Sequence, residues 1–361
     1  MPSRSASANG KVVAVTGASG YFAGGLVRAL CAEEKIGRVL GFDVRTSEFD
    51  HPKYVFDLMD VRSPAIEDRL RGVDTLVHLA FIMDPIKDEP LMRDVNVNGS
   101  QNVFRRAGNA GVNKIVYTSS AVVYGAHADN PVPLTEESPL RANLDFSYAA
   151  HKLEVEYVVR EFRDDHPGVT VTVFRPAIVF GAHVDSAWSH LLELPLFIGV
   201  RDHSPSFQFV HEEDVAAALI FAITNELDGP YNLAPRDWME SGEILAAAGR
   251  KRLDLPEAAV FSLVERLWDL GLSEVPAGMM HYAMHPWLVS ADKLAAEGFT
   301  CSKTTRQSLD DLLQGIGGYT RIGTKRVTKG GMFRGAAAGA GVLGAGLLWR
   351  AARRRRTPAP W

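Results

Sequence analysis

The feature that most constrains the fold is a regular alternation between short apolar runs and longer amphipathic stretches in the first half of the chain. Each apolar run is rich in Val, Ile, Leu or aromatic residues, which is typical of a buried β-strand. The runs are KVVAVT (11–16), RVLGFD (38–43), KYVFD (53–57), DTLVHLA (74–80), NKIVYTSS (113–120) and VTVTVFRP (169–176). Helical patterns separate them, at Gly20–Glu33, Glu89–Ala110 and Ser147–Asp165. Near-continuous apolar strands that alternate with helices predict an α/β fold with a doubly wound parallel sheet, covered by helices on both faces.

The pattern changes after Gly181, where Pro, His and Trp residues interrupt the alternation. Helices are expected near Glu212–Thr224, Glu257–Leu270 and Arg306–Leu313, and one strand at Pro230–Ala234. We predict a disordered lead-in (1–10), a sheet domain (11–181), a smaller part (182–315) and a basic Gly/Ala-rich tail (316–361). Because ligands of open α/β sheets bind beyond the carboxyl ends of the strands, the smaller part is expected to form a wall of the substrate pocket.

Composition narrows the class of protein. A chain of 361 residues that is 46% hydrophobic and 23% charged can bury a sizeable core. Cys31 and Cys301 stand in no metal-ligand spacing, and the pair His281 and His285 has no third ligand of suitable spacing, so no metal site is expected. The polar N-terminus lacks the apolar region of a secretory signal, and a reducing cytoplasm is the simplest setting.

Charge is distributed unevenly along the chain. The last segment, 321–361, holds ten of the 39 Lys and Arg residues and none of the 43 Asp and Glu residues, which leaves residues 1–320 with a net charge of −14. An acidic body argues against a nucleic-acid partner, whereas a basic tail would be attracted to an anionic membrane surface. The uncharged segment 335–349 would span about 22 Å as a helix, short of the ~30 Å hydrocarbon core, so peripheral attachment to or anchoring on the inner face of a membrane and a disordered extension both stay open.

A glycine-rich turn follows the first predicted strand. The motif TGASGYFAGG begins a helix directly after that strand, and Gly17 and Gly20 would allow a tight turn there. Their backbone N–H groups could approach a pyrophosphate at the positive end of the helix. Tyr21 and Phe22 belong to the same turn and are further candidate cofactor contacts, and Ala23 holds the third small position.

Acidic residues end the next two predicted strands. Asp43 lies 26 residues after Gly17, where a carboxylate can accept hydrogen bonds from a ribose of the dinucleotide. This carboxylate would repel a 2′-phosphate and Arg45 could pair with one, so NAD is favoured while NADP stays open. Asp57 and Leu58 end the third strand and are expected beside the adenine ring.

A tyrosine and a lysine stand at helical spacing in the predicted helix 147–165. Tyr148 and Lys152 lie on one face of that helix because residues i and i+4 are neighbours. A nearby ammonium favours the ionised form of a phenol, so Lys152 is expected to lower the pKa of Tyr148 and make it a usable acid/base. Ser120, at the end of the strand before this helix, adds a hydroxyl donor, and the three groups are predicted to converge at the carboxyl edge of the sheet.

The order of these motifs resembles that of extended short-chain dehydrogenases/reductases. The matching segments are TGASGYFA, Asp43, Asp57-Leu58, HLA (78–80), NVNGS (96–100), YTSSAVVYG (117–125), YAAHK (148–152) and RPAIVFG (175–181). The resemblance covers residues 11 to about 315 and implies a Rossmann-type NAD-binding domain at 11–181 and a mainly substrate-binding part at 182–315.

The resemblance also implies roles for single residues. Ser120 would orient the substrate carbonyl or hydroxyl, Tyr148 would exchange its proton, and Lys152 would hold the nicotinamide ribose and tune Tyr148. Further cofactor contacts or supports would be Leu79, Ala80, Pro176 and Asn96, the last with a partly structural role.

Two positions depart from the nucleotide-sugar epimerases of this family. Phe207 stands where those enzymes commonly carry an arginine for the substrate pyrophosphate. Those enzymes also carry an asparagine shortly after the arginine of strand six, whereas this chain has Pro176 and apolar residues there. Both losses favour a less charged substrate, as in the hydroxysteroid dehydrogenase and flavonoid reductase branches, although Arg201 or Arg236 could supply the missing charge. The scattered tryptophans are expected mainly in the core; they include Trp188, Trp238, Trp268 and Trp287.

Three functions follow from these observations. The leading hypothesis is an NAD-dependent dehydrogenase or reductase that moves a hydride to or from a carbinol or ketone carbon of a small molecule. An NAD-dependent nucleotide-sugar epimerase/dehydratase would use the same catalytic residues, so these residues cannot discriminate between the two. The third hypothesis, from another class, is a non-catalytic dinucleotide-binding sensor or scaffold. The sequence leaves a homodimer open.

Overall fold

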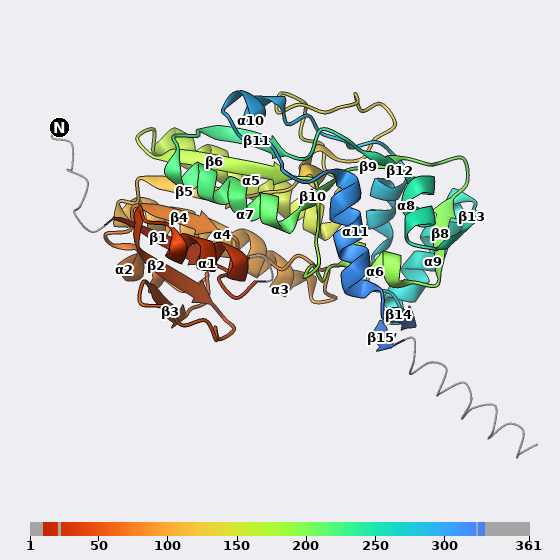
Figure 1. Ribbon diagram of the computed structural model, residues 1–361, viewed down its shortest axis with the longest axis horizontal. Coiled ribbons are helices and arrows are strands. Elements are labelled where there is room, and N and C mark those ends of the chain that lie inside the picture. The colour runs from red at the N-terminus through yellow and green to blue at the C-terminus, as the bar shows by residue number, and fades with distance from the viewer. Residues whose placement is uncertain (1–9, 21–22, 323, 329–361) are drawn as a thin grey trace, which may run out of the picture.

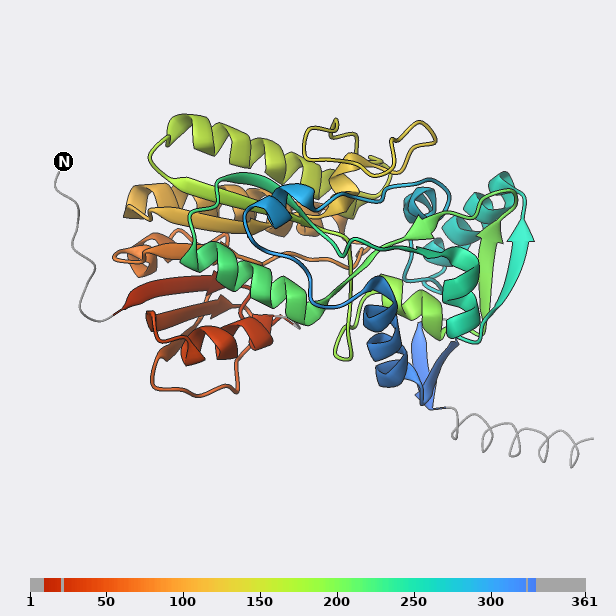
Figure 2. The same ribbon diagram turned by 45° about the horizontal axis from the view of Figure 1, so that its top comes forward.

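The computed structural model describes residues 10–20, 23–322 and 324–328. Figures 1 and 2 show a sheet with its helices at one end of the molecule and a smaller part at the other. The sheet has seven strands in the order β11-β6-β5-β4-β1-β2-β3, and every neighbouring pair is parallel. The strands are β1 (Lys11–Thr16), β2 (Ile36–Asp43), β3 (Tyr54–Leu58), β4 (Thr75–His78), β5 (Lys114–Thr118), β6 (Thr170–Pro176) and β11 (Gly229–Leu233). The predicted doubly wound Rossmann-type sheet is therefore confirmed.

Helices cover both faces of this sheet. One face packs against α1 (Ala23–Ala32) and α7 (Glu212–Thr224), and the other against α2 (Ile66–Leu70), α4 (Gly99–Ala110) and α5 (Ser147–Asp165). Successive side chains of β1 alternate between the two cores: Val13 and Val15 join the first, and Ala14 the second. Burial on both faces explains why the strands read as nearly continuous apolar runs.

Two predicted elements differ in detail. The helical pattern 89–110 forms three successive pieces, α3 (Glu89–Arg93), the π-helix η1 (Asp94–Asn98) and α4. Strand β11 and helix α7 come from residues beyond Gly181, yet β11 pairs with β6 and α7 packs on the sheet. Segment 182–315 thus contributes to the sheet as well as to the smaller part.

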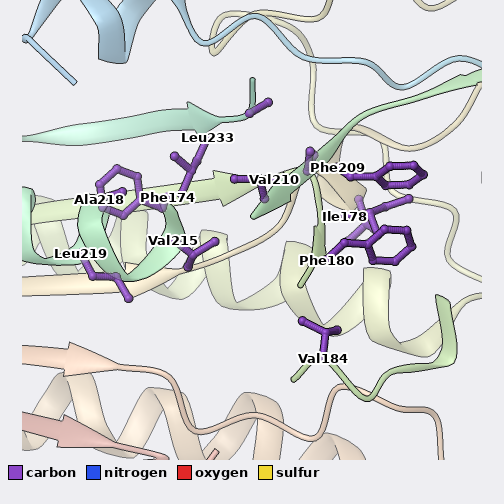
Figure 3. Packing of buried hydrophobic residues seen from close by; sticks show 14 of the residues in the cluster. Phe174, Ile178, Phe180, Val184, Phe209, Val210, Val215, Ala218, Leu219 and Leu233 are labelled. Atoms are coloured by element: carbon purple, nitrogen blue, oxygen red, sulfur yellow. The ribbon is translucent and has the colours of Figure 1, made fainter. Parts of the chain in front are cut away.

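The smaller part consists of short helices and two-stranded pairs. Its elements are β7 (Ile178–Phe180), α6 (Ala187–Glu193), β8 (Leu196–Val200), β9 (Ser206–Phe207), β10 (Phe209–His211), β12 (Met239–Glu240), α8 (Ser241–Ala247), β13 (Lys251–Leu255), α9 (Glu257–Asp269), η3 (Ala277–Ala283), α11 (Thr305–Ile316) and the hairpin β14 (Tyr319–Ile322) with β15 (Lys325–Thr328). Helix α10 (Asp292–Ala296) packs against β11 of the large sheet instead. The 3₁₀ turn η2 (Ala121–Tyr124) follows β5. Figure 3 shows apolar side chains continuing from the sheet into this part, where the rings of Phe180 and Phe209 stack at 4.2 Å.

Several predicted features lie outside the described residues. These are residues 1–9 of the lead-in, Tyr21 and Phe22 of the glycine-rich turn, and the tail segment 335–349. Within the part of the chain that the structure describes, no helix is long and apolar enough to cross a membrane.

Candidate active site

A pocket opens at the carboxyl edge of the sheet, between the sheet and the smaller part. On the sheet side it is lined by Leu79 after β4, Ser120 after β5 and Pro176 at the end of β6. On the opposite side it is lined by residues of α6 and η3, among them Trp188 and Met279. This is the position at which open parallel sheets bind ligands, because the strand ends and the loops after them converge there.

The three predicted catalytic residues meet in this pocket. Ser120 caps the turn η2, and its hydroxyl is hydrogen-bonded to the partly buried phenol of Tyr148. Lys152 lies one turn further along α5, is buried, and donates from Nζ to the carbonyl oxygen of Thr118 at 2.7 Å. Its ammonium also lies 3.7 Å from the ring centre of Phe81, a cation–π contact that the sequence did not suggest.

The electrostatics of the pair differ from the prediction. Burial raises the pKa of Tyr148 to about 12, against an opposing effect of the Ser120 hydrogen bond. Burial lowers the pKa of Lys152 to about 7, partly offset by the charge of Glu156. The expected lowering of the phenol pKa by Lys152 is therefore wrong for this structure: its Nζ lies 5.9 Å from the Tyr148 ring centre, and desolvation dominates both groups. At neutral pH the phenol carries its proton.

A buried ion pair behind the pocket was not identified from the sequence. Arg175 on β6 binds Glu156 on α5 with two hydrogen bonds, of 2.9 and 2.6 Å. Ser119 donates to the same carboxylate at 2.6 Å, and Arg175 also donates to the hydroxyl of Tyr124 at 2.8 Å. These bonds fix α5, which carries Tyr148, to the strand ends.

The glycine-rich turn is packed against the strand end beside it. Gly17 has a φ of +72°, and a Cβ placed there would lie 2.7 Å from the backbone nitrogen of Ala80. Gly20 closes the turn by donating its N–H to the carbonyl of Gly17 at 2.9 Å. Glycine at position 17 is thus required both for the left-handed backbone and for the close approach of two chain segments.

Asp43 holds the end of this turn. Its buried carboxylate accepts hydrogen bonds from the backbone N–H groups of Ser19 and Arg45, at 3.0 and 2.9 Å. The exposed side chain of Arg45 returns to the carbonyl of Ser19 at 3.1 Å. Each carboxylate oxygen keeps further lone pairs, so a ribose hydroxyl could still donate to it.

The two residues at the end of β3 have different surroundings. The carboxylate of Asp57 forms an ion pair with Arg69 of α2, so its side chain is already engaged. Leu58 is 66% exposed, so its side chain offers an apolar surface that a flat ring could contact.

Asn96 lies in the π-helix η1 and holds the loop after β4. Its side-chain oxygen accepts from the N–H of Ile82 at 2.7 Å, and its nitrogen donates to the Ile82 carbonyl at 3.0 Å. Beside it, His78 links Thr16 to Ser100 through bonds of 2.7 and 2.9 Å. Burial, reinforced by the Lys152 charge, lowers the pKa of His78 to about 3, so this histidine is a neutral structural link.

The remainder of the pocket is mostly apolar. Trp188 and Trp287, expected mainly in the core, both line it, and their rings lie 5.9 Å apart. Neither Arg201 nor Arg236 is among its lining residues. Within the described chain, the charged side chains that line it are Lys152 and Asp84. The sequence predicted that the smaller part forms a wall of the pocket but not which residues line it, because they come from α6 and from segments about a hundred residues further along the chain.

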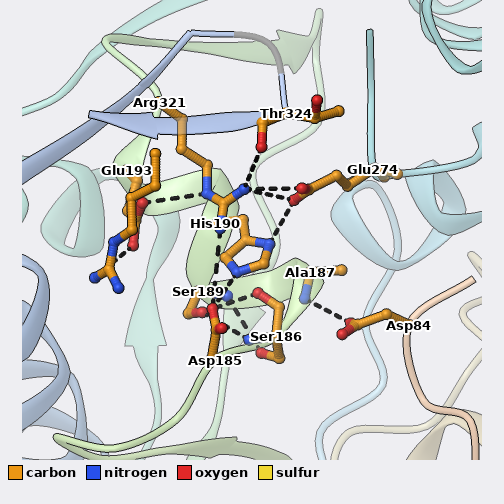
Figure 4. A network of polar contacts seen from close by, with 12 residues as sticks. Asp84, Asp185, Ser186, Ala187, Ser189, His190, Glu193, Glu274, Arg321 and Thr324 are labelled. Atoms are coloured by element: carbon orange, nitrogen blue, oxygen red, sulfur yellow. Dashed lines mark hydrogen bonds and ion pairs between the residues drawn. The ribbon is translucent and has the colours of Figure 1, made fainter. Parts of the chain in front are cut away.

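A network of ion pairs supports the far wall of the pocket, which is the side opposite the sheet that contains α6 (Figure 4). Arg321 of the C-terminal hairpin contacts Glu193 at 3.1 Å and Glu274 at 2.8 Å. His190 contacts Glu274 at 2.5 Å, and Asp84 accepts the N–H of Ala187 at 2.9 Å. The hairpin thereby holds α6, which presents Trp188 to the pocket.

No group of three or more residues in the described chain is arranged to hold a metal ion. His281 instead pairs with Asp145 at 2.9 Å.

Together, the seven-stranded sheet, the glycine turn and the Ser–Tyr–Lys group define an extended short-chain dehydrogenase/reductase. The family model "NAD dependent epimerase/dehydratase family" matches residues 13–234. The chain therefore belongs to this family of enzymes, as the motifs predicted.

The proteins that are similar to this chain carry different descriptions. An uncharacterized protein of Mycobacterium tuberculosis (strain H37Rv) is 26% identical over 317 residues, which is 85% of this chain and 84% of the relative. Sterol demethylase protein B of Methylococcus capsulatus is 30% identical over 251 residues, 64% of this chain and 71% of the relative. The structure of MoeE5 in complex with UDP-glucuronic acid and NAD superposes with a TM-score of 0.67 at 20% identity, covering 85% of this chain and 99% of that one, which is a likeness of fold.

Proposed function

We propose that this chain is an NAD-dependent dehydrogenase or reductase acting on a carbinol or ketone carbon of an apolar small molecule. The observation that carries the proposal is the position of Tyr148, Ser120 and Lys152 in a pocket whose other lining residues are mostly apolar.

The residues around the glycine turn suit a dinucleotide. Gly17 lets the turn pack closely against Ala80 at the end of β4, and the carboxylate of Asp43 lies at the turn. Thr118 lines the pocket, and its buried Oγ1 has no hydrogen-bond partner within the described chain, so it is available to a ligand. When bound, NAD supplies the hydride acceptor, and its reduced form the hydride donor.

Tyr148 and Ser120 handle the proton. Because the pKa of Tyr148 is raised to about 12, the phenol is protonated at neutral pH and can donate to a substrate carbonyl oxygen as that carbon is reduced. In the opposite direction the phenolate would take the hydroxyl proton. Ser120, hydrogen-bonded to Tyr148, is positioned to orient the same oxygen.

The lining of the pocket favours this function over nucleotide-sugar epimerisation. A sugar nucleotide brings a pyrophosphate, which calls for cationic or multiple N–H donors. Among the described lining residues the only cation is Lys152, and it is bound to Thr118 at the catalytic end. Similarity to a sterol demethylase protein supports an apolar substrate, whereas the fold likeness to MoeE5 keeps the epimerase/dehydratase as the second candidate.

A substrate screen tests the proposal. The full-length protein is incubated with sterols, small ketones and secondary alcohols, and sugar nucleotides, each with NAD, NADH, NADP and NADPH, while absorbance at the nicotinamide band and the products are followed. Turnover of a neutral carbinol or ketone with net change in NADH is the expected result. Turnover of a sugar nucleotide alone would establish the epimerase/dehydratase, and cofactor binding without any turnover would indicate a sensor or scaffold.

A further inference from the structure

A second apolar compartment adjoins the candidate active site. Ile178 and Trp188 line both pockets, so the two share a wall. Figure 3 shows Ile178 beside the stacked rings of Phe180 and Phe209, which line this second compartment. Most of its other lining residues are also large and apolar; they include Leu191, Leu192, Phe197, Phe207, Ile244 and Leu245.

Trp188 lies between the two compartments. Its ring is 5.9 Å from that of Trp287, which lines the catalytic pocket, and 6.4 Å from that of Phe207, which lines the second compartment. A side chain with an aromatic neighbour on each side can contact one ligand that extends through both spaces.

The polar groups of the second compartment are already hydrogen-bonded. Ser241 donates from its hydroxyl to the carbonyl of Pro205. Arg252 donates to the carboxylate of Asp254 at 2.6 Å and to the carbonyl oxygens of Val200 and His203. A hydrocarbon bound in this space would leave these bonds intact.

We propose that the second compartment binds the hydrocarbon end of the substrate whose reacting carbon lies at Tyr148. This inference rests on the proposed function and specifies its substrate class: an elongated neutral alcohol or ketone with a fused-ring or long-chain apolar body. Trp188 and Phe207 are then specificity-determining residues, because both line the second compartment.

The test uses the full-length protein and the neutral fluorophore N-phenyl-1-naphthylamine as the probe. Wild type, Phe207→Arg and Leu245→Lys are titrated with it, and Phe221→Arg serves as the matched control. Phe221 is also partly buried, but it lies on α7 against Phe299 and lines neither compartment. Circular dichroism and NAD affinity verify that each variant is folded.

We expect the probe to bind wild type and the control alike, and at least about tenfold more weakly to Phe207→Arg and Leu245→Lys. Competition with 2-alkanols of increasing length should strengthen about fourfold per methylene in wild type, the ratio that corresponds to 0.8 kcal/mol, and the increments should end earlier in Phe207→Arg. Absence of probe binding, equal binding by Phe207→Arg, or displacement of the probe by UDP would each overturn the inference.

These readouts are independent of turnover. Length-dependent binding together with no oxidation of any alcohol would contradict the proposed function while leaving the compartment established. Oxidation of small alcohols without length-dependent binding would support the proposed function and contradict the role of the second compartment.

Discussion

The two sides of the candidate active site are built by different means. The sheet side consists of polar groups at strand ends, such as Ser120 and Asp43, and backbone hydrogen bonds or tight packing fix their positions. The far side consists of apolar rings on short elements, such as Trp188 on α6, which ion pairs to Glu193 and Glu274 hold in place.

The sheet side therefore holds the groups for catalysis, and the far side holds those for substrate selection. The groups that would move a proton depend on the register of a parallel sheet, which allows little variation in their position. The groups that would select a substrate depend on surface-like contacts between short segments, which can change without disturbing the sheet. Substitutions on the two sides should therefore have different effects.

The largest effect is expected from the sheet side, on turnover. Tyr148→Phe should reduce kcat by about a hundredfold to ten-thousandfold, because it removes the proton donor, and should leave NAD affinity nearly unchanged. Steady-state kinetics and NAD titration measure this. Tyr157→Phe, an exposed tyrosine on the same helix, is the control and should behave as wild type. Retained turnover in Tyr148→Phe would rule out the assignment.

The next prediction concerns pH and stability. The pKa of Lys152 is about 7 in the folded protein, below its ordinary value near 10.5, so between these pH values the unfolded chain holds a proton that the folded chain has lost. Stability therefore rises with pH in this window, by at most about 1.4 kcal/mol per unit. In urea unfolding from pH 7 to 10, the free energy of unfolding of wild type should rise with pH relative to that of Lys152→Met. A pH-independent difference between them would contradict the pKa shift.

On the far side, Arg321→Ala should lower the free energy of unfolding by about 2–3 kcal/mol. It leaves the buried carboxylate of Glu193 with Arg326 alone and detaches Glu274 from the hairpin. The control is Arg306→Ala, whose exposed pair with Asp310 is worth only about 0.3–0.5 kcal/mol. Equal losses in the two variants, by urea unfolding, would show that the network does not support this wall.

Gly17→Ala should destabilise the sheet side by about 2 kcal/mol. It combines a strained left-handed residue with a Cβ only 2.7 Å from Ala80. Gly72→Ala has a similar φ of +80° but open space around its Cβ, so it should lose only the roughly 1 kcal/mol of backbone strain. Urea unfolding separates the two, and NAD affinity should fall only in Gly17→Ala. Equal losses of stability in the two variants would show that the close contact with Ala80 is not what requires glycine at position 17.

The smallest effect concerns cofactor choice. Wild type should bind NAD more tightly than NADP, and Asp43→Ala should narrow the gap by about tenfold, because the carboxylate that repels a 2′-phosphate is gone while Arg45 remains. Calorimetric titration with both cofactors measures this. Tighter binding of NADP by wild type would defeat the prediction.

The sequence by itself determined the sheet and the groups at its edge. Helix 147–165 begins and ends as predicted, and Tyr148, Lys152 and Ser120 come together, because period, strand ends and i, i+4 spacing are local properties. The glycine-rich turn could also be predicted, because its motif is a local property of the sequence.

Only the tertiary structure decided the far wall and the electrostatics. Trp188 and Trp287 pack in or against the core, as expected, but only the fold shows that segments about a hundred residues apart bring both of them to one pocket. The sequence placed Asp57 at the end of a strand, but only the fold shows that Arg69, twelve residues further on, pairs with its carboxylate. The pKa of Tyr148 rose where the spacing to Lys152 alone predicted a fall, because burial depends on every segment that covers a group, and spacing along a helix contains no information about that.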